Sequence, residues 1–425
     1  MDALNLKERA AAIFETTNTL SDELLKAGSD EPSLAHGLPP PLHANAPESD
    51  LKKLKQQLLE MADELRALLT EPSMHLAPLQ RLPYSVHPIV RLGITEVFPE
   101  QGATVSDIAL SAGLRESLVR RLLAHAATYH VFFEAEPDFY VHTAASRLLC
   151  QSQPVRDWVY AGWDEMMPAA FKLGEALSRY PDSQEPEHCA WNVANNTTKP
   201  IFQVFETHPE RAKHFAGAMV WYASYPGFEP EHLIEGFPWP VPPSNNDKEN
   251  LKVIDVGGGR GHISIALAEH SPTTKFIVQD VPDIVAQGEE SLPETSKDAI
   301  LFQSHDFFEP QPVEGADIYL LRQILHDWSD KYAMKIIRAL IPALKSGAKV
   351  VVNDRVMPGH REVHYLVERE ARDSDMSMLS FQNAQERSRD DWLALFRAAD
   401  ERFEVTAIRK PDRSVLSVIE VTWRG

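Results

Sequence analysis

The sequence predicts an α/β fold, a doubly wound and mostly parallel sheet, preceded by a mainly helical N-terminal part. From residue 251 onward, short apolar segments alternate with helical patterns, as in chains where helices connect parallel strands. Residues 253–261 read Val-Ile-Asp-Val-Gly-Gly-Gly-Arg-Gly, which is typical of a strand that runs into a tight glycine turn. Asp280 ends the next apolar segment, where a carboxylate can accept hydrogen bonds from a ribose.

Composition limits the kinds of protein to consider. The chain has 425 residues, enough for two or three domains, and a formal net charge of −20, which opposes binding to nucleic acids. Cys150 and Cys189, the two cysteines, form neither a disulfide framework nor the spacing of a metal site. We see neither an apolar run near about 18 residues nor a secretory leader, so we expect no membrane association. By elimination we expect a cytoplasmic protein.

Residues 1–80 are predicted to hold two helices, at 5–27 and 48–70. The second has apolar residues near helical period from Leu51 to Leu68. The proline-rich segment between the helices is predicted to be a loop. Their apolar stripes can pack on a second subunit or on their own chain, and the pattern alone leaves both open.

Residues 81–150 are predicted to form a winged-helix-like unit. Its expected elements are helices at 87–92, 104–113 and 115–128 and wing strands at 131–134 and 139–142. The last helix carries three arginines, as a DNA-reading helix would: Arg115, Arg120 and Arg121. Because the chain around them is acidic, we favour a unit used for packing over one that binds DNA.

Residues 151–245 are predicted to be mainly helical and to line a pocket for a flat apolar ligand. Large apolar side chains are frequent here, and most are expected in the core, while some suit the wall of such a pocket. The residues expected at the acceptor are His130, Phe132, Met166, Met219, Trp221 and Met376. Residues 237–250, with four prolines, are predicted to be a linker or surface loop.

Residues 246–425 are predicted to hold the sheet. The expected strands are 252–256, 275–279, 299–303, 316–321, 349–353 and 415–422. The expected helices are 261–269, 283–290, 330–344 and 388–399, the third capped by Ser329 or Asp330. Ligands of such sheets bind at the carboxyl ends of the strands, so the residues there are the candidates for function.

The glycine turn favours a nucleoside over a dinucleotide. A dinucleotide fingerprint would need glycine at the position of His262. The pattern present, Asp255-x-Gly257-x-Gly259-x-Gly261, fits a loop beneath S-adenosylmethionine. An ordinary strand-to-helix turn is the alternative. Asp306 and Phe307 follow the third strand and can contact an adenine, or can be a turn residue and a core residue.

His326 is the candidate general base. It lies just beyond the strand 316–321, close to the predicted nucleoside, and a neutral histidine is a ready proton acceptor. Asp354 ends the next strand and Glu386 precedes the last helix. Either carboxylate can accept the second N–H of the imidazole and fix its tautomer. The alternatives are a loop histidine held by hydrogen bonds and an exposed Glu386.

With these residues in view, the chain resembles class I S-adenosylmethionine-dependent O-methyltransferases, the plant-type small-molecule enzymes and their fungal relatives in secondary metabolism. The resemblance implies N-terminal dimerisation helices and hence a homodimer, a winged helix, and a Rossmann-like domain. It implies a small-molecule acceptor, catalytic residues His326, Asp354 and Glu386, and no metal. Its cofactor-binding residues would be Asp255, Gly257, Gly258, Gly259, Asp280, Val281, Asp306, Phe307 and Arg322. Phe307 replaces the family's methionine, Arg322 a lysine and Asp354 a glutamate.

The implied reaction is transfer of a methyl group to a phenol or enol hydroxyl of an aromatic or polyketide-type metabolite. Two alternatives remain open. Some fungal relatives resemble these enzymes but catalyse dehydration or pericyclic cyclisation. Such an enzyme could use His326, or hydrogen bonds from His130 and Arg322, without transferring methyl. A DNA-binding regulator built on the winged helix is the second alternative, and the acidic charge opposes it.

Overall fold

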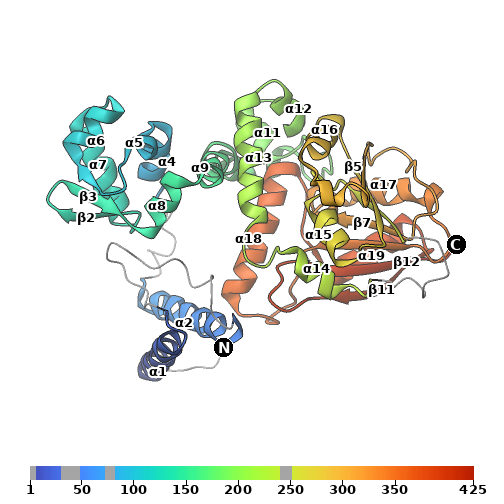
Figure 1. The fold of residues 1–425 in the computed structure, drawn as a ribbon, viewed down its shortest axis with the longest axis horizontal. Coiled ribbons are helices and arrows are strands. Elements are labelled where there is room, and N and C mark those ends of the chain that lie inside the picture. Colours follow the sequence, from blue (N-terminus) through green and yellow to red (C-terminus); the bar gives the residue numbers. More distant parts are fainter. Residues whose placement is uncertain (1–5, 30–47, 72–81, 240–250) are drawn as a thin grey trace. The chain divides into compact units, whose positions relative to one another are not determined.

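The computed structural model describes residues 6–29, 48–71, 82–239 and 251–425, and the chain divides into two units (Figure 1). The N-terminal unit comprises Met1–Trp163 together with Lys213–Met219, and the C-terminal unit comprises Asp164–Ala212 and Val220–Gly425. The predicted loop between the first two helices and all but three residues of the predicted linker 237–250 lie outside the described residues. No helix of the described ranges is both long and apolar enough to span a bilayer.

The two helices predicted for the first 80 residues are present as α1 (Leu6–Lys26) and α2 (Glu48–Leu69). They pack on each other through a small apolar cluster that contains Leu20, Leu24 and Leu51. Part of their apolar surface is therefore covered by the chain's own helices.

The winged helix is also present in the N-terminal unit. Its elements are α4 (Pro83–Arg91), α5 (Ile94–Val97), β1 (Ala103–Thr104), α6 (Val105–Ala112), α7 (Glu116–Ala127), β2 (Phe132–Glu136) and β3 (Phe139–His142). The strands form one antiparallel sheet in the order β1-β3-β2. Thr104 caps α6 by accepting the Asp107 N–H. On α7, Arg120 binds Asp138 at 2.6 Å and Glu116 at 2.7 Å, so its charge is neutralised within the unit.

The region predicted to be mainly helical is helical. It follows α8 (Ala144–Gln151) and contains α9 (Gln153–Tyr160), the π-helix η1 (Ala161–Met166), α10 (Met167–Arg179), α11 (Ala190–Asn195), α12 (Ile201–Glu206), α13 (Pro209–Ala223) and α14 (Pro230–Gly236). The expectation that its large apolar residues are mostly core holds for Trp191, which is fully buried. It fails for Phe171, whose residue surface is 81% exposed on α10.

The C-terminal unit is built on a seven-stranded sheet in the order β11-β12-β8-β7-β4-β5-β6. The strands are β4 (Lys252–Val256), β5 (Lys275–Asp280), β6 (Ile300–Ser304), β7 (Ile318–Arg322), β8 (Lys349–Asp354), β11 (Phe403–Arg409) and β12 (Ser417–Trp423). The first five are parallel, and the β11–β12 hairpin adds two antiparallel strands beside β8. Six strands match the predicted ones, and the edge strand β11 was not predicted. A short parallel pair, β9 (Val356–Met357) and β10 (Arg387–Ser388), lies outside this sheet.

Helices cover both faces of the sheet. Successive residues of a strand point to opposite faces, so each strand packs against helices on both sides. Val253, Ile318 and Leu320 pack with α14, α15 (His262–His270) and α16 (Pro282–Ser291). Ile254, Tyr319 and Leu321 pack on the other face with α17 (Asp330–Leu340) and α19 (Arg389–Ala399). The doubly wound fold is therefore confirmed. An 18-residue helix, α18 (Tyr365–Gln382), was not predicted.

The start of α17 differs from the prediction. Ser329 stands at the N-cap position but makes no capping bond. Its hydroxyl donates instead to the Gln184 carbonyl at 2.7 Å, which ties the segment before α11 to the start of α17. The Ser329 hydroxyl, which the local sequence pattern predicts as a helix cap, therefore binds a residue distant in the sequence instead.

Candidate active site

The candidate site lies where the strand order reverses. Going outward from β4, the chain continues through β5 and β6 on one side and through β7 and β8 on the other. Such a switch point leaves a crevice at the carboxyl ends of the strands. The glycine turn follows β4, Asp280 ends β5, His326 follows β7 and Asp354 ends β8, so the sheet gathers the predicted residues at one edge.

The glycine turn packs tightly below and is open above. A Cβ on Gly257, whose φ is +72°, would lie 2.5 Å from Ile324 Cδ1. A Cβ on Gly258 would lie 2.5 Å from the carboxyl carbon of Asp255. At Gly259, whose φ is +59°, no heavy atom lies within 4 Å of the position that a Cβ would take. The turn therefore needs glycine to fit against the strand ends, and it leaves space for a ligand over Gly259.

Two aspartates hold this turn. Asp280 accepts the Gly259 N–H at 2.9 Å and the Val281 N–H at 2.8 Å, and burial raises its pKa despite these bonds. Asp255 is buried beneath the turn and accepts the Ser264 hydroxyl at 2.7 Å. Burial raises the pKa of Asp255 to about 6. Asp255 therefore supports the turn from below, while Asp280 lies beside it at the ligand edge.

Aromatic rings close one side of the turn. Phe307 Cε1 lies 3.7 Å from the position of a Cβ on Gly257. The Trp328 ring crosses that of Phe307 edge-on at a centroid distance of 6.0 Å. Asp306 accepts the Phe308 N–H at 2.9 Å, as a turn residue does. Phe307 thus packs against the glycine turn at Gly257, and one Asp306 oxygen is already bonded within the chain.

Arg322 is a mostly buried cation between the turn and the candidate base. It donates to the Asn353 side chain and, at 2.5 Å, to the Phe228 carbonyl. Burial lowers the pKa of Arg322 to about 10, against the opposite influence of Asp255 and Asp354. The guanidinium therefore stays charged at neutral pH and is held by the protein's own groups.

His326 lies in the single 3₁₀ turn η3 (Leu325–Asp327) and is hydrogen-bonded to Glu386. Its Nδ1 lies 3.2 Å from Glu386 Oε1, and its Nε2 lies 3.6 Å from Asp327 Oδ1. A carboxylate at Nδ1 favours the tautomer that leaves Nε2 as the basic nitrogen. The same Glu386 oxygen accepts the Ser374 hydroxyl at 2.7 Å, and the Glu386 N–H donates to Asp375 at 2.9 Å.

The Asp354 carboxylate differs from that of Glu386 in its hydrogen bonding. Both of its carboxylate oxygens are buried and have no hydrogen-bond partner among the described residues. Of the two carboxylates considered from the sequence, Glu386 is therefore the one that bonds the imidazole, and Asp354 acts on it only through space. Burial, with the neighbouring Glu386 and Asp327, raises the pKa of Asp354 to about 7.

The carboxylates around His326 set its charge. Burial alone would lower the pKa of His326, but Asp327, Asp354 and Glu386 outweigh it and raise that pKa well above 6.5. Burial would raise the pKa of Glu386, yet its bond with His326 holds it below its usual value. The surrounding carboxylates therefore favour the protonated ring, and the His326–Glu386 bond favours an imidazolium beside a carboxylate.

Sequence reasoning missed several contributors. Asp327 follows His326 directly and could have been found by adjacency. Ser374 and Asp375 lie on the unpredicted helix α18, and Arg387 follows Glu386 in the chain. Ser374 and Asp375 contact Glu386 across 12 and 11 residues, and Arg387 contacts Leu325 across 62 residues. The sequence gives no local signal for these contacts.

The predicted acceptor residues have different surroundings. Within the C-terminal unit, Met376 lies on α18 with 46% of its surface exposed, Met166 ends η1, and Trp221 lies on α13. His130 and Met219 belong to the N-terminal unit. The prediction that Phe132 contacts the acceptor is corrected. Phe132 is 1% exposed in the winged-helix core, where its ring packs against Phe98 and His142. Its burial leaves no surface for an acceptor.

Comparisons with known proteins identify the family. A family model described as O-methyltransferase domain matches residues 247–401, and one described as O-methyltransferase dimerisation domain matches residues 74–152. O-methyltransferase AMT9 of Alternaria alternata is 38% identical over 392 residues, 89% of this chain and 88% of that protein. The chain is an S-adenosylmethionine-dependent O-methyltransferase. This O-methyltransferase is also 32% identical to O-methyltransferase pyvH of Aspergillus violaceofuscus over the full length of both.

Solved structures share the fold of this O-methyltransferase. The crystal structure of OxaC superposes with a TM-score of 0.76 at 18% identity, over 98% of this chain and 100% of that one. The LepI complex with SAM does so with a TM-score of 0.75 at 20% identity, over 98% and 100%. The Rossmann-like fold behind a helical dimerisation domain is thus confirmed, as is S-adenosylmethionine as the cofactor.

Asp280→Asn is expected to weaken S-adenosylmethionine binding by about 10–100-fold, because a hydrogen bond to a charged group contributes roughly 1.5–3 kcal/mol. Calorimetric titration with S-adenosylhomocysteine would measure the loss. Asp283→Asn, on α16 three residues along the chain, is the control and should bind normally. Equal affinity of Asp280→Asn and the unmodified enzyme would remove Asp280 from the cofactor site.

Proposed function

We propose that this O-methyltransferase methylates a phenol or enol hydroxyl of a small aromatic or polyketide-type metabolite, with His326 as the general base. The observation that carries the proposal is the His326–Glu386 pair, at 3.2 Å between Nδ1 and Oε1. Its support from relatives is the grayanic acid biosynthesis cluster O-methyltransferase of Cladonia grayi, 34% identical over 98% of this chain and 87% of that protein.

The cofactor supplies a methyl group already activated on a sulfonium, so the protein has to position the acceptor and remove its proton. A phenol with a pKa of about 10 is mostly protonated at neutral pH. Neutral His326 accepts that proton at Nε2, and Glu386 stabilises the resulting imidazolium. Asp354 adds negative charge without a bond, which strengthens the base and raises the pH at which it becomes neutral.

The residues of the glycine turn fit the nucleoside of S-adenosylmethionine. The open space over Gly259 would take the nucleoside, and Asp280, which already accepts the Gly259 N–H, would also accept hydrogen bonds from the ribose. Phe307 would lie against the adenine. Asp306 has a second oxygen for the adenine amino group, and Arg322 supplies positive charge near the cofactor's carboxylate. Asp255, Gly257, Gly258 and Val281 shape the turn.

The acceptor is proposed to lie against apolar side chains from several helices. The proposed lining residues within the C-terminal unit are Met166, Trp221 and Met376. Methionine and tryptophan suit a flat, carbon-rich ligand because they offer polarisable, adaptable surface. We further propose that the enzyme is a homodimer assembled through its N-terminal helices.

The stoichiometry of the cofactor tests the reaction. A methyltransferase forms one S-adenosylhomocysteine for each product molecule, and the product gains one methyl group. Incubation with a panel of phenolic and enolic polyketides, analysed by mass spectrometry, should show both together. Product formed without S-adenosylhomocysteine would instead indicate a cyclisation or dehydration enzyme that keeps its cofactor intact.

A further inference from the structure

The segment that carries His326 has little regular structure to hold it. η3 is one turn of three residues between the end of β7 and the start of α17. We propose that Arg387 is a positioning residue for methyl transfer: its guanidinium fixes the backbone on both sides of His326, so that the ring meets Glu386. The inference rests on the proposed role of His326 as the base.

The contacts of Arg387 bracket the base. Its two terminal nitrogens donate to the Leu325 carbonyl at 2.7 Å and to the Trp328 carbonyl at 2.8 Å. Its Nε donates to Asp330 Oδ1 at 2.9 Å. The bonded carbonyls belong to the residue before His326 and to the second residue after it. The planar guanidinium of Arg387 therefore fixes the backbone on both sides of His326. Only arginine offers several donors in one plane for this purpose.

Arg387 is itself held rigidly. Its side chain has 0% exposure, its guanidinium carbon lies 5.3 Å from the centre of the buried Trp392 ring, and its backbone pairs with Val356 in the β9–β10 ladder. The Asp330 carboxylate that orients the guanidinium also accepts the Gln385 amide at 2.8 Å. The guanidinium therefore has fixed groups behind it and beside it.

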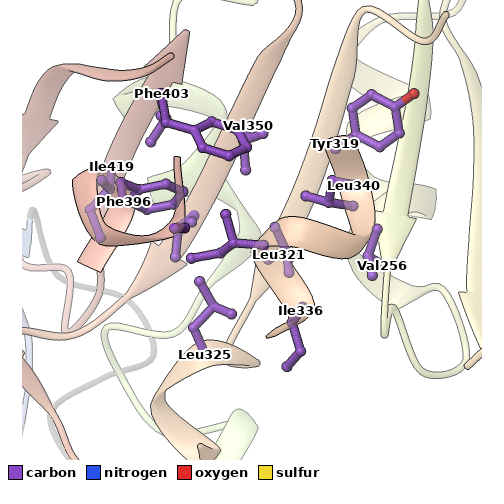
Figure 2. Packing of buried hydrophobic residues seen from close by; sticks show 14 of the residues in the cluster. Val256, Tyr319, Leu321, Leu325, Ile336, Leu340, Val350, Phe396, Phe403 and Ile419 are labelled. Carbon is purple, nitrogen blue, oxygen red and sulfur yellow. The ribbon is translucent and has the colours of Figure 1, made fainter. Parts of the chain in front are cut away.

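Three consecutive residues thus act on the same segment. Gln385 binds Asp330, Glu386 binds the His326 ring, and Arg387 binds the carbonyls around it. Leu325 supplies a further anchor, because its side chain is fully buried in the core beside Leu321 and Ile336 (Figure 2). Proton transfer requires heavy atoms within about 2.6–3.2 Å, so a small shift of this segment removes the base from its acceptor.

Arg387→Lys tests the inference, because it keeps the charge but cannot donate to three oxygens in one plane. We expect kcat to fall by about 10²-fold, the loss typical of a misplacement near 1 Å, while the affinity for S-adenosylhomocysteine is unchanged. If the His326 ring moves away from Asp327, Asp354 and Glu386, its pKa is raised less by these carboxylates. The acidic limb of kcat should therefore move towards pH 6.5, which a general loss of stability would not cause.

Two further variants separate positioning from stability. Arg338→Lys is the matched control. Arg338 lies at the far end of α17 and also donates to two carbonyls, those of Ala398 at 2.8 Å and Ala399 at 2.9 Å. It should keep kcat and the acidic limb. Combined with Glu386→Gln, Arg387→Lys should add little further loss, because both changes act through one imidazole.

The outcomes are distinct. Wild-type kcat and an unmoved acidic limb in Arg387→Lys, or losses that add fully with Glu386→Gln, would overturn the inference while leaving His326 as the base. If Arg387→Lys does not fold, Asp330→Asn replaces it. The Asp330 side chain is 49% exposed, so the change is tolerated more easily, and it removes the carboxylate that orients the Arg387 guanidinium. A fall in kcat with the same shift supports the inference, and an unchanged profile refutes it. Turnover retained in His326→Ala would instead refute the proposed function.

Discussion

His326→Ala should lower kcat by about 10²–10⁴-fold, the contribution typical of a positioned general base. The imidazole lies at the reversal point of the sheet with Nδ1 on Glu386, and no other histidine of the described residues pairs with that carboxylate. Alanine leaves the acceptor hydroxyl without a proton acceptor, and the sulfonium cannot compensate at neutral pH. Residual turnover should rise with pH as the acceptor ionises by itself.

The cofactor should still bind to this variant. The glycine turn, Asp280 and Phe307 do not depend on the imidazole, so calorimetry with S-adenosylhomocysteine should give the unmodified affinity. His270→Ala, at the exposed end of α15, is the control and should retain full turnover. Near-normal kcat in His326→Ala would show that the proton leaves by another route.

The parts of the fold that the sequence predicted are those set by local pattern. The strands predicted at 252–256 and 275–279 are short, largely apolar segments whose residues are mostly buried. The turn after the first needs glycine for its φ angles. Helix α19 begins with a capping box between Ser388 and Asp391, again a local signal. Such signals do not require knowledge of distant residues.

The parts that were missed depend on tertiary contacts. Helix α18 buries only Ala371, Ser380 and Phe381, so its apolar stripe is short and interrupted by charges. Strand β11 lies at the sheet edge, where one neighbour suffices and the apolar pattern is weak. The choice between two carboxylates as the partner of His326 depends on where the chain returns 60 residues later, which no local pattern encodes.

Asp354→Asn should make the enzyme more stable at pH 8 and change its stability little near pH 4. The folded-state pKa of Asp354 is about 7 against an ordinary value of 3.8, and its oxygens have no hydrogen-bond partner among the described residues. Below pH 4 both folded and unfolded chains carry the proton. Between pH 3.8 and about 7 the unfolded chain has already lost the proton while the folded chain keeps it, so stability falls across this range and changes no further with this group above it. At roughly 1.4 kcal/mol per pKa unit, the penalty reaches a few kcal/mol.

Urea unfolding at a series of pH values would measure this gain. Asp400→Asn is a control of opposite sign, because side-chain bonds from Arg402 lower the pKa of Asp400 to about 2, and that variant should lose stability at neutral pH. Equal unfolding curves for Asp354→Asn and the unmodified enzyme at pH 8 would show that the buried carboxylate carries no penalty.

The same substitution should weaken catalysis, which explains why a destabilising acid is present. Removing the Asp354 charge removes one of the three carboxylates that raise the pKa of His326, so the acidic limb of kcat should move to lower pH. The imidazole then becomes a weaker base towards a phenol, and kcat at high pH should fall. A buried acid that costs stability yet strengthens the base is a trade between folding and function, and opposite changes in the two measurements would demonstrate it.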